Sequence, residues 1–199
     1  EDRRHIQQRD VERLRAGIAT KLNLEMAVTD EMVRLASQLR PDDACFVPER
    51  REELTTEGGL AVAAQRDRIR AAVETLQAKG INVNLFIDPD NEQVEASRET
   101  GAHGVEIHTG RYANSSRTRA READEVQRVA ALARSSGLEV HGGHGLNYDN
   151  VVPIAAIAEI VELNIGHSII ARAIMVGMEQ AVREMKALLD GARDGRARA

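Results

Sequence analysis

The segment Leu138-Glu-Val-His-Gly-Gly-His-Gly-Leu-Asn-Tyr148 decides the fold class of this 199-residue chain. It begins with a short apolar strand candidate, Leu138–His141, and continues as a glycine-rich loop that carries His144. A titratable side chain directly after a buried parallel strand is typical of (β/α) barrels, whose active sites form at the carboxyl ends of the strands. The same arrangement recurs along the rest of the chain.

Six short apolar segments are typical of buried strands. They are Asn23–Met26, Ala44–Val47, Asn82–Ile87, Gly104–His108, Leu138–His141 and Val161–Ile165. Nearly all of them carry or precede a reactive polar side chain: Glu25, Asp88, Glu106 with His108, His141 with His144, and His167. This recurrence favours a barrel over an open doubly wound sheet, and none of the predicted strands is followed by a glycine-rich dinucleotide-binding turn.

Helices are predicted between the strands from apolar spacing and from capping and stop residues. The predicted helices are Asp10–Leu22, Thr29–Leu39, Leu60–Lys79, Asn91–Thr100, a long helix ending at Ser136, Val152–Ile157 and Ser168–Leu189. Regular alternation of strands and helices predicts a parallel sheet. We predict one partial (β/α)8 (TIM) barrel domain over residues 1–190, lacking the first strand, the first helix and the second strand, and a disordered basic tail over residues 191–199.

Composition narrows the functional classes. The charged fraction is 30% and the net charge is −5, so no excess of basic residues points to nucleic acid. Two tyrosines, two phenylalanines and no tryptophan leave no aromatic platform for stacking bases. The single cysteine, Cys45, fits a reducing compartment, and no apolar stretch in the sequence is long enough to span a membrane. We therefore expect a cytoplasmic location, with no nucleic-acid or membrane partner.

The loop around His144 is the strongest candidate for chemistry. Glycines on both sides of the histidine allow a close approach of the backbone to a ligand and a positive φ angle. An imidazole can move protons near neutral pH. The alternative is a glycine-rich turn with a surface histidine, and the position after a barrel strand favours catalysis.

Three other segments are candidates for binding or catalysis. Gly166 and His167 end the last predicted strand just before a helix, where barrels often bind phosphate. Glu25 interrupts an apolar strand and suits a general base, or else is a structural carboxylate held by an arginine. The loop from Thr55 to Gly59 can hold a hydroxylated or phosphorylated ligand.

Glu106 and His108 alternate onto one side of a strand. They are compatible with an acid–base pair, metal ligands or a buried polar network, and the role of His141 is equally open. We favour no metal site, because the spacing of His141 and His144 lies on a loop and matches no helical metal motif.

Six runs of residues, in order, resemble the pyridoxine 5′-phosphate synthase family. They are Glu1-Asp-Arg-Arg-His-Ile6, Asn23-Leu-Glu-Met-Ala27, Leu54-Thr-Thr-Glu-Gly-Gly-Leu60, Val105-Glu-Ile-His-Thr-Gly-Arg-Tyr112, Gly143-His-Gly-Leu-Asn-Tyr148 and Glu162-Leu-Asn-Ile-Gly-His-Ser-Ile-Ile170. The resemblance implies a (β/α)8 barrel and a homo-octamer without cofactor or metal. It also implies condensation of 1-deoxy-D-xylulose 5-phosphate with 3-amino-2-oxopropyl phosphate to pyridoxine 5′-phosphate, phosphate and water.

The resemblance also implies roles for individual residues. Glu25 matches a catalytic proton acceptor and His144 the catalytic proton donor. His5 and Thr55 match contacts to the deoxyxylulose phosphate, and Gly145 also matches a ligand contact. Gly166 and His167 match the binding site for the aminooxopropyl phosphate.

The chain also departs from the family pattern. A family segment with an Asn-x-Asp-His motif, an arginine and a further catalytic histidine is expected upstream of Glu1, and Ala158 and His103 replace common family residues. We therefore expect the polypeptide Glu1–Ala199 alone to be inactive and prone to aggregate. The alternatives are another phosphate-binding barrel enzyme or a non-catalytic barrel. The three lysines, Lys21, Lys79 and Lys186, lie on predicted helices or their ends, which disfavours a Schiff-base aldolase.

Overall fold

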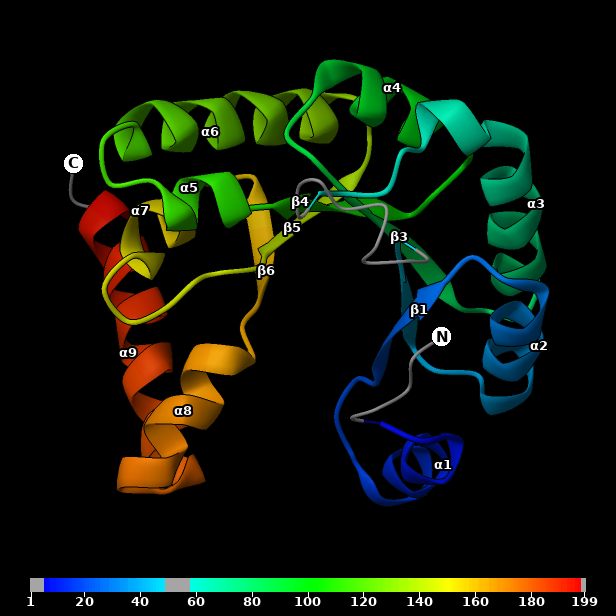
Figure 1. Cartoon of the computed structure of the whole chain (residues 1–199), viewed down its shortest axis with the longest axis horizontal. Helices are drawn as coiled ribbons and strands as arrows, with labels where there is room; N and C mark the ends of the chain where they lie inside the picture. The colour runs from blue at the N-terminus through cyan, green and yellow to red at the C-terminus, as the bar shows by residue number, and fades with distance from the viewer. Residues whose placement is uncertain (1–5, 49–57, 198–199) are drawn as a thin grey trace. The chain divides into compact units, whose positions relative to one another are not determined.

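The computed structural model describes residues 6–48 and 58–197 (Figure 1). The strands are β1 (Asn23–Ala27), β2 (Asp43–Val47), β3 (Asn82–Ile87), β4 (Gly104–His108), β5 (Glu139–Gly143) and β6 (Ile160–Asn164). They form one sheet in the order β1-β2-β3-β4-β5-β6, and the pairs β1–β2, β2–β3 and β5–β6 are parallel. The predicted α/β alternation and parallel pairing are confirmed. The boundaries of β3 and β4 are as predicted, and those of the other strands differ by one or two residues.

The helices alternate with these strands. They are α1 (Gln8–Gly17), α2 (Asp30–Leu39), α3 (Arg66–Gln77), α4 (Asn91–Glu99), α5 (Gly110–Asn114), α6 (Arg119–Ser135), α7 (Val151–Ala155), α8 (His167–Val176) and α9 (Met178–Ala197). A short 3-10 helix, η2 (Ala63–Gln65), precedes α3. No helix in the described ranges is long and apolar enough to cross a membrane.

Three helix predictions were wrong in their boundaries. The first helix ends at Gly17 rather than Leu22, and the segment before β1 is extended at Ile18. The helix predicted to start at Leu60 starts as η2 and continues as α3. The helix predicted over Ser168–Leu189 is two helices, because Gly177 has φ 85° and ψ 154° and interrupts the helical hydrogen bonding.

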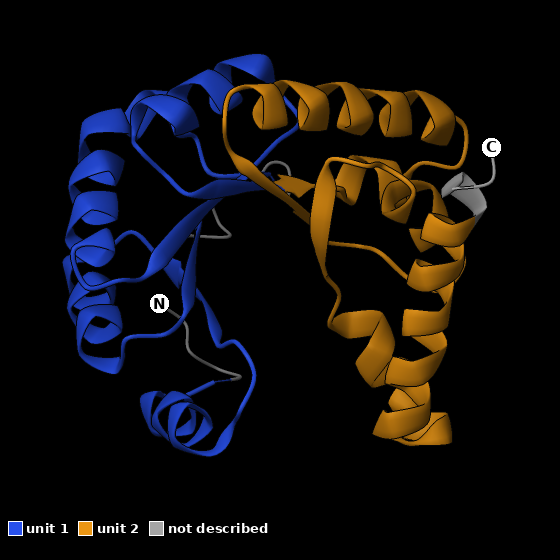
Figure 2. Cartoon of the chain, turned by 180° about the vertical axis from the view of Figure 1, so that it is seen from behind, with its two compact units in different colours: residues 1–106 blue, residues 107–199 orange. Residues whose placement is uncertain are grey.

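The chain divides into two compact units, residues 1–106 and 107–199 (Figure 2). In the first unit, helices α2, α3 and α4 contact one another in sequence and pack on the strands. The core contains the fully buried side chains of Phe46, Ile69, Leu76 and Leu85. Thr29 caps the start of α2 as predicted, since its side-chain oxygen accepts from the Met32 amide at 3.2 Å.

In the second unit, α6 packs on β5, and α9 packs on both α7 and α8. The buried core includes Val129, Val140, Ile154 and Ile160. Helix α8 has no buried residue, and Ile174 and Met175 are 81% and 79% exposed. Ile170, Met178 and Val182 are exposed as well, so part of the apolar surface of these two helices faces outward.

Candidate functional site

The loop after β5 has an unusual backbone at its histidine. His144 has φ 79° and the following Gly145 has φ 77°. A left-handed conformation costs a residue with a Cβ atom about 1–2 kcal/mol, whereas glycine adopts it freely. The prediction of positive φ in this loop is confirmed, but the strain falls on the histidine itself. Such strain persists only where surrounding contacts hold it.

Thr109, directly after β4, supplies those contacts. Its hydroxyl lies 2.7 Å from the carbonyl oxygen of Gly143 and 2.7 Å from that of His144. Its backbone amide also donates to the Gly143 carbonyl at 2.8 Å. The Thr109 side chain is fully buried, so these bonds are shielded from water.

Further side-chain hydrogen bonds hold the next two carbonyls of the loop. The Gly145 carbonyl accepts from Nδ2 of Asn150 at 3.2 Å, and the Leu146 carbonyl accepts from Oγ of Ser168 at 2.8 Å. Four consecutive carbonyls, Gly143 to Leu146, are thus each bonded to a side chain. The Ser168 bond also places this loop beside the first turn of α8.

Asn150 is itself fixed from two sides. Its Oδ1 accepts from the Asn147 amide at 2.7 Å, and its carbonyl accepts from the Tyr112 hydroxyl at 2.6 Å. Burial raises the pKa of the Tyr112 phenol, so the hydroxyl remains a hydrogen donor at neutral pH.

The imidazole of His144 is exposed, and the ring of His108 lies against it. The two ring centroids are 4.8 Å apart at an interplanar angle of 66°, an edge-to-face contact. A Cβ atom at Gly110 would lie 2.5 Å from Nε2 of His108 and 3.2 Å from Cδ2 of His144, so only glycine fits there. His108 is 3% exposed, whereas His144 remains accessible to a ligand.

The predicted phosphate site lies at the start of α8. Gly166 is the N-cap residue and His167 the first helical residue, and both are exposed. A helix N-terminus presents free amides and a partial positive charge. Within the second unit, the bond from Ser168 to Leu146 links this helix start to the loop that carries His144 and Gly145.

Glu25 lies in the first unit, exposed in the middle of β1. It is in register with Cys45, which is in register with Asn84 of β3. The thiol of Cys45 lies 3.5 Å from Oε2 of Glu106. Paired residues of neighbouring strands point to the same side, so one face of this part of the sheet is polar. No arginine among the described residues contacts Glu25.

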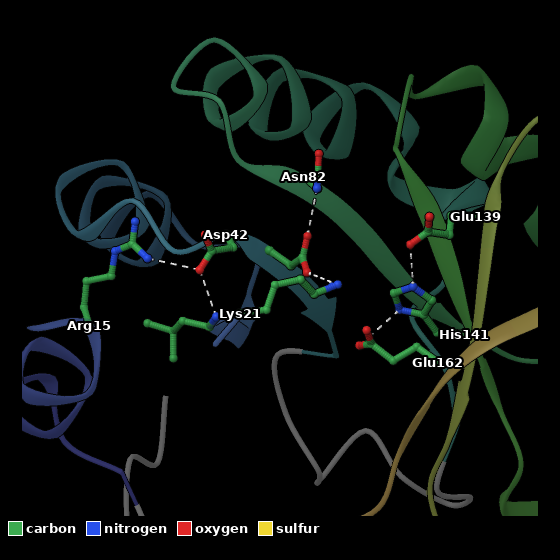
Figure 3. A network of polar contacts seen from close by, with 9 residues as sticks. Arg15, Lys21, Asp42, Asn82, Glu139, His141 and Glu162 are labelled. Atoms are coloured by element: carbon green, nitrogen blue, oxygen red, sulfur yellow. Dashed lines mark hydrogen bonds and ion pairs between the residues drawn. The ribbon is translucent and has the colours of Figure 1, made fainter. Parts of the chain in front are cut away.

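Two residues with open roles lie in buried polar contacts. His141 is 1% exposed, and its Nε2 lies 2.9 Å from Glu139 while its Nδ1 lies 3.7 Å from Glu162 (Figure 3). Glu106 is 4% exposed beside Cys45. In the described part of the chain, no group of three or more His, Cys, Asp and Glu side chains is arranged to hold a metal ion.

Two predicted substrate contacts, His5 and Thr55, lie outside the described residues. The loop from Thr55 to Gly59 is described only at Gly58 and Gly59. A Cβ atom at Gly59 would lie 2.2 Å from the Asp88 amide nitrogen, so this glycine packs directly on the end of β3.

The model of the family described as "Pyridoxal phosphate biosynthesis protein PdxJ" matches residues 1–191 of this sequence. The chain belongs to the PdxJ family. Pyridoxine 5′-phosphate synthase of Synechococcus sp. (strain CC9605) is 56% identical over 194 residues, which are 97% of this chain and 78% of the relative. The synthase of Syntrophotalea carbinolica is 55% identical over 96% of this chain and 81% of its own.

A solved structure with the same fold is that of a mandelate oxidase. It superposes with a TM-score of 0.57 at 16% identity and covers 92% of this chain and 60% of that one. With PdxJ membership and the sequential strand order, this fold likeness confirms the prediction of an incomplete (β/α) barrel. This PdxJ chain spans about four-fifths of the two bacterial relatives.

Sequence reasoning about this PdxJ chain missed Thr109 and Asn150 as parts of the site. Thr109 lies 34 and 35 residues from the carbonyls that it contacts, so no local pattern connects them. Asn150 could have been predicted from the sequence, because an asparagine close to a glycine-rich loop is a usual partner for turn carbonyls and amides.

Proposed function

We propose that this chain carries the reaction of pyridoxine 5′-phosphate synthase. The substrates are 1-deoxy-D-xylulose 5-phosphate and 3-amino-2-oxopropyl phosphate, and the products are pyridoxine 5′-phosphate, phosphate and water. The observation that carries the proposal is the identity of 55–56% to synthases of that name over 96–97% of the chain. Cofactors and metals have no part in the proposal.

His144 is the proposed proton donor. Imine formation, loss of phosphate, ring closure and dehydration each need a proton delivered to an oxygen that leaves or to an atom that gains charge. The exposed imidazole, held by a bonded backbone and a neighbouring ring, suits that task. A donor fixed in one orientation loses little freedom on reaching the transition state.

Glu25 is the proposed proton acceptor. Its carboxylate is exposed on β1 and lies on the polar face shared with Cys45 and Asn84. A carboxylate without an ion-pair partner among the described residues is free to take up a proton from a substrate carbon or nitrogen.

The aminooxopropyl phosphate is proposed to bind at Gly166 and His167. The start of α8 offers amide hydrogens and the positive end of the helix dipole, and His167 is exposed beside them. Gly145, with its positive φ, allows the loop backbone to approach a ligand closely. His5 and Thr55 are proposed as contacts to the deoxyxylulose phosphate.

The test is to supply both substrates to the complete protein and measure pyridoxine 5′-phosphate. His144→Ala is expected to lower kcat by about 10²–10⁴-fold, the usual contribution of a general acid. His103→Ala is the matched control, because this exposed histidine precedes β4 at the opposite end of the strand from His108. Wild-type turnover in His144→Ala would contradict the proposed role, and product absent from the wild type would contradict the proposed reaction.

The family resemblance further supports a homo-octamer in the cytoplasm as the working form of the complete protein. Mass photometry at nanomolar concentration tests the assembly. A mass of one or two chains as the active species would contradict the octamer.

A further inference from the structure

The proposed role of His144 as a proton donor does not explain what holds its backbone in a disfavoured conformation. A histidine with φ 79° is held in a conformation that its own backbone disfavours. If released, the residue would turn to an ordinary φ and carry its imidazole away from its present place. The contacts that resist this rotation therefore set where the proton donor lies.

Thr109 contacts both peptide groups that define the conformation of His144. The Gly143 carbonyl belongs to the peptide before His144, on which φ depends, and the His144 carbonyl belongs to the peptide after it, on which ψ depends. The hydroxyl of Thr109 lies 2.7 Å from each oxygen, so one hydroxyl hydrogen is shared between them. Rotation about either bond of His144 moves one carbonyl away from this hydroxyl.

The geometry around the ring complements this backbone clamp. His108, the residue before Thr109, contacts the His144 ring edge-to-face, and Gly110, the residue after it, leaves just enough space for both rings. Three consecutive residues thus surround His144. Thr109 bonds the backbone around it, His108 contacts its ring, and Gly110 leaves room for that ring.

We propose that Thr109 is a positioning residue that keeps His144 in its left-handed conformation and so aims the imidazole at the substrate. The inference rests on the proposed function for its effect on catalysis. Thr109 takes no proton and touches no reacting atom in this proposal, because its hydroxyl is buried against the loop.

Thr109→Val removes the hydroxyl and keeps the shape and the backbone amide. In the complete protein we expect kcat to fall by about 10–100-fold, the size of effect that a small misplacement of a catalytic group produces, with KM changed by less than about threefold. Thr109→Ser keeps a hydroxyl and is expected to retain most of kcat.

Thr100→Val is the matched control for loss of a buried hydroxyl. Thr100 is 2% exposed, and its hydroxyl donates to the Ser97 carbonyl at 2.7 Å at the end of α4. We expect Thr100→Val to lower the Tm to a similar extent as Thr109→Val while leaving kcat near the wild-type value. Wild-type kcat in folded Thr109→Val would overturn the proposal, as would an equal loss of kcat in Thr100→Val.

A double-mutant cycle separates positioning from independent action. If Thr109 acts through His144, then adding Thr109→Val to His144→Ala lowers the residual rate by less than about threefold. A further loss as large as in the wild-type background would overturn the proposal.

Amide hydrogen exchange tests the clamp without reference to chemistry. Thr109→Val is expected to raise exchange over residues 143–146, and Thr100→Val is expected to leave it unchanged. Unaltered exchange in Thr109→Val would overturn the inference even if His144 is catalytic. Faster exchange together with a His144→Ala variant of full activity would instead retain the clamp and contradict the proposed function.

Discussion

At the scale of single residues, backbone strain at His144 is balanced by hydrogen bonds from neighbouring buried residues. His144 has the strained backbone, and the buried residue Thr109 donates a hydrogen bond to its carbonyl, while the buried residue Asn150 donates one to the carbonyl of the next residue, Gly145. Sequence patterns identified His144 because a histidine between glycines after a strand is itself a local signal. They did not identify Thr109, since the carbonyls that it contacts lie 34 and 35 residues away in the sequence.

Asp42 provides a residue-scale prediction about pH. Its carboxylate accepts from the Leu22 amide at 2.9 Å and from Arg15 at 3.0 Å (Figure 3). The Leu22 hydrogen bond, together with Arg15, lowers the pKa of Asp42 below its ordinary value of 3.8. A carboxyl group whose pKa is lower in the folded protein stabilises the fold at pH values above its pKa in the unfolded chain. This contribution disappears as the pH falls through its pKa in the folded protein.

We therefore expect Asp42→Asn to lower the Tm at pH 7 by a small amount, on the order of 1–2 °C, since the charge is partly exposed. The difference from the wild type is expected to shrink as the pH falls below the ordinary value of 3.8. Thermal unfolding across pH measures both. Asp67→Asn is the control, because the Asp67 side chain is 96% exposed. A constant difference at all pH values would contradict a role for the charge.

At the scale of elements, the strands were predicted well and the helix ends poorly. Buried strands of apolar residues are short and bounded by polar loops, so their positions are visible in the sequence. Helix α5 was missed because five residues are too few to show helical spacing. The break between α8 and α9 was missed because apolar residues continue at intervals of four across Gly177, which is the spacing of one uninterrupted helix.

The break at Gly177 gives an element-scale prediction. Its φ of 85° with ψ of 154° lies in a region open almost only to glycine. Gly177→Ala is expected to destabilise the protein by about 1–3 kcal/mol through backbone strain, with no steric clash to add to it, since no atom lies within 4 Å of the new Cβ.

Gly191→Ala is the matched control with the opposite sign. Gly191 lies inside α9, also with no atom within 4 Å of a Cβ, so alanine is expected to stabilise by about 0.5–1 kcal/mol. Urea unfolding of both variants measures the two free energies. Changes of the same sign in the free energy of unfolding would contradict the idea that backbone conformation determines the effect of alanine at these two positions.

At the scale of the whole molecule, the sheet has two edge strands, β1 and β6, each paired on one side among the described strands. Unpaired strand edges promote association with other chains. We therefore expect the polypeptide Glu1–Ala199 to self-associate as its concentration rises, which size-exclusion chromatography measures. Elution as a single chain at every concentration would contradict this prediction.

The exposed side chains of α8 give a second prediction at this scale. Ile174 and Met175 are 81% and 79% exposed, and neighbouring exposed apolar residues favour association. In the polypeptide Glu1–Ala199, we expect Ile174→Gln with Met175→Gln to raise the temperature at which light scattering increases. The Tm should change little, because exposed sites contribute little to stability.

Leu14→Gln is the control, since Leu14 is a single apolar side chain of α1 that is 42% exposed. It is expected to leave the onset of scattering unchanged. An equal effect from both changes would mean that general surface polarity, rather than the face of α8, controls association.

The order of the strands has a consequence for how this protein is made. Each strand lies beside the one synthesised immediately before it, from β1 to β6. As the chain leaves the ribosome, every new strand meets a neighbour that has already emerged, and pairing can proceed during translation without waiting for distant segments. The exposed apolar side chains of α8 emerge only after all six strands have been made.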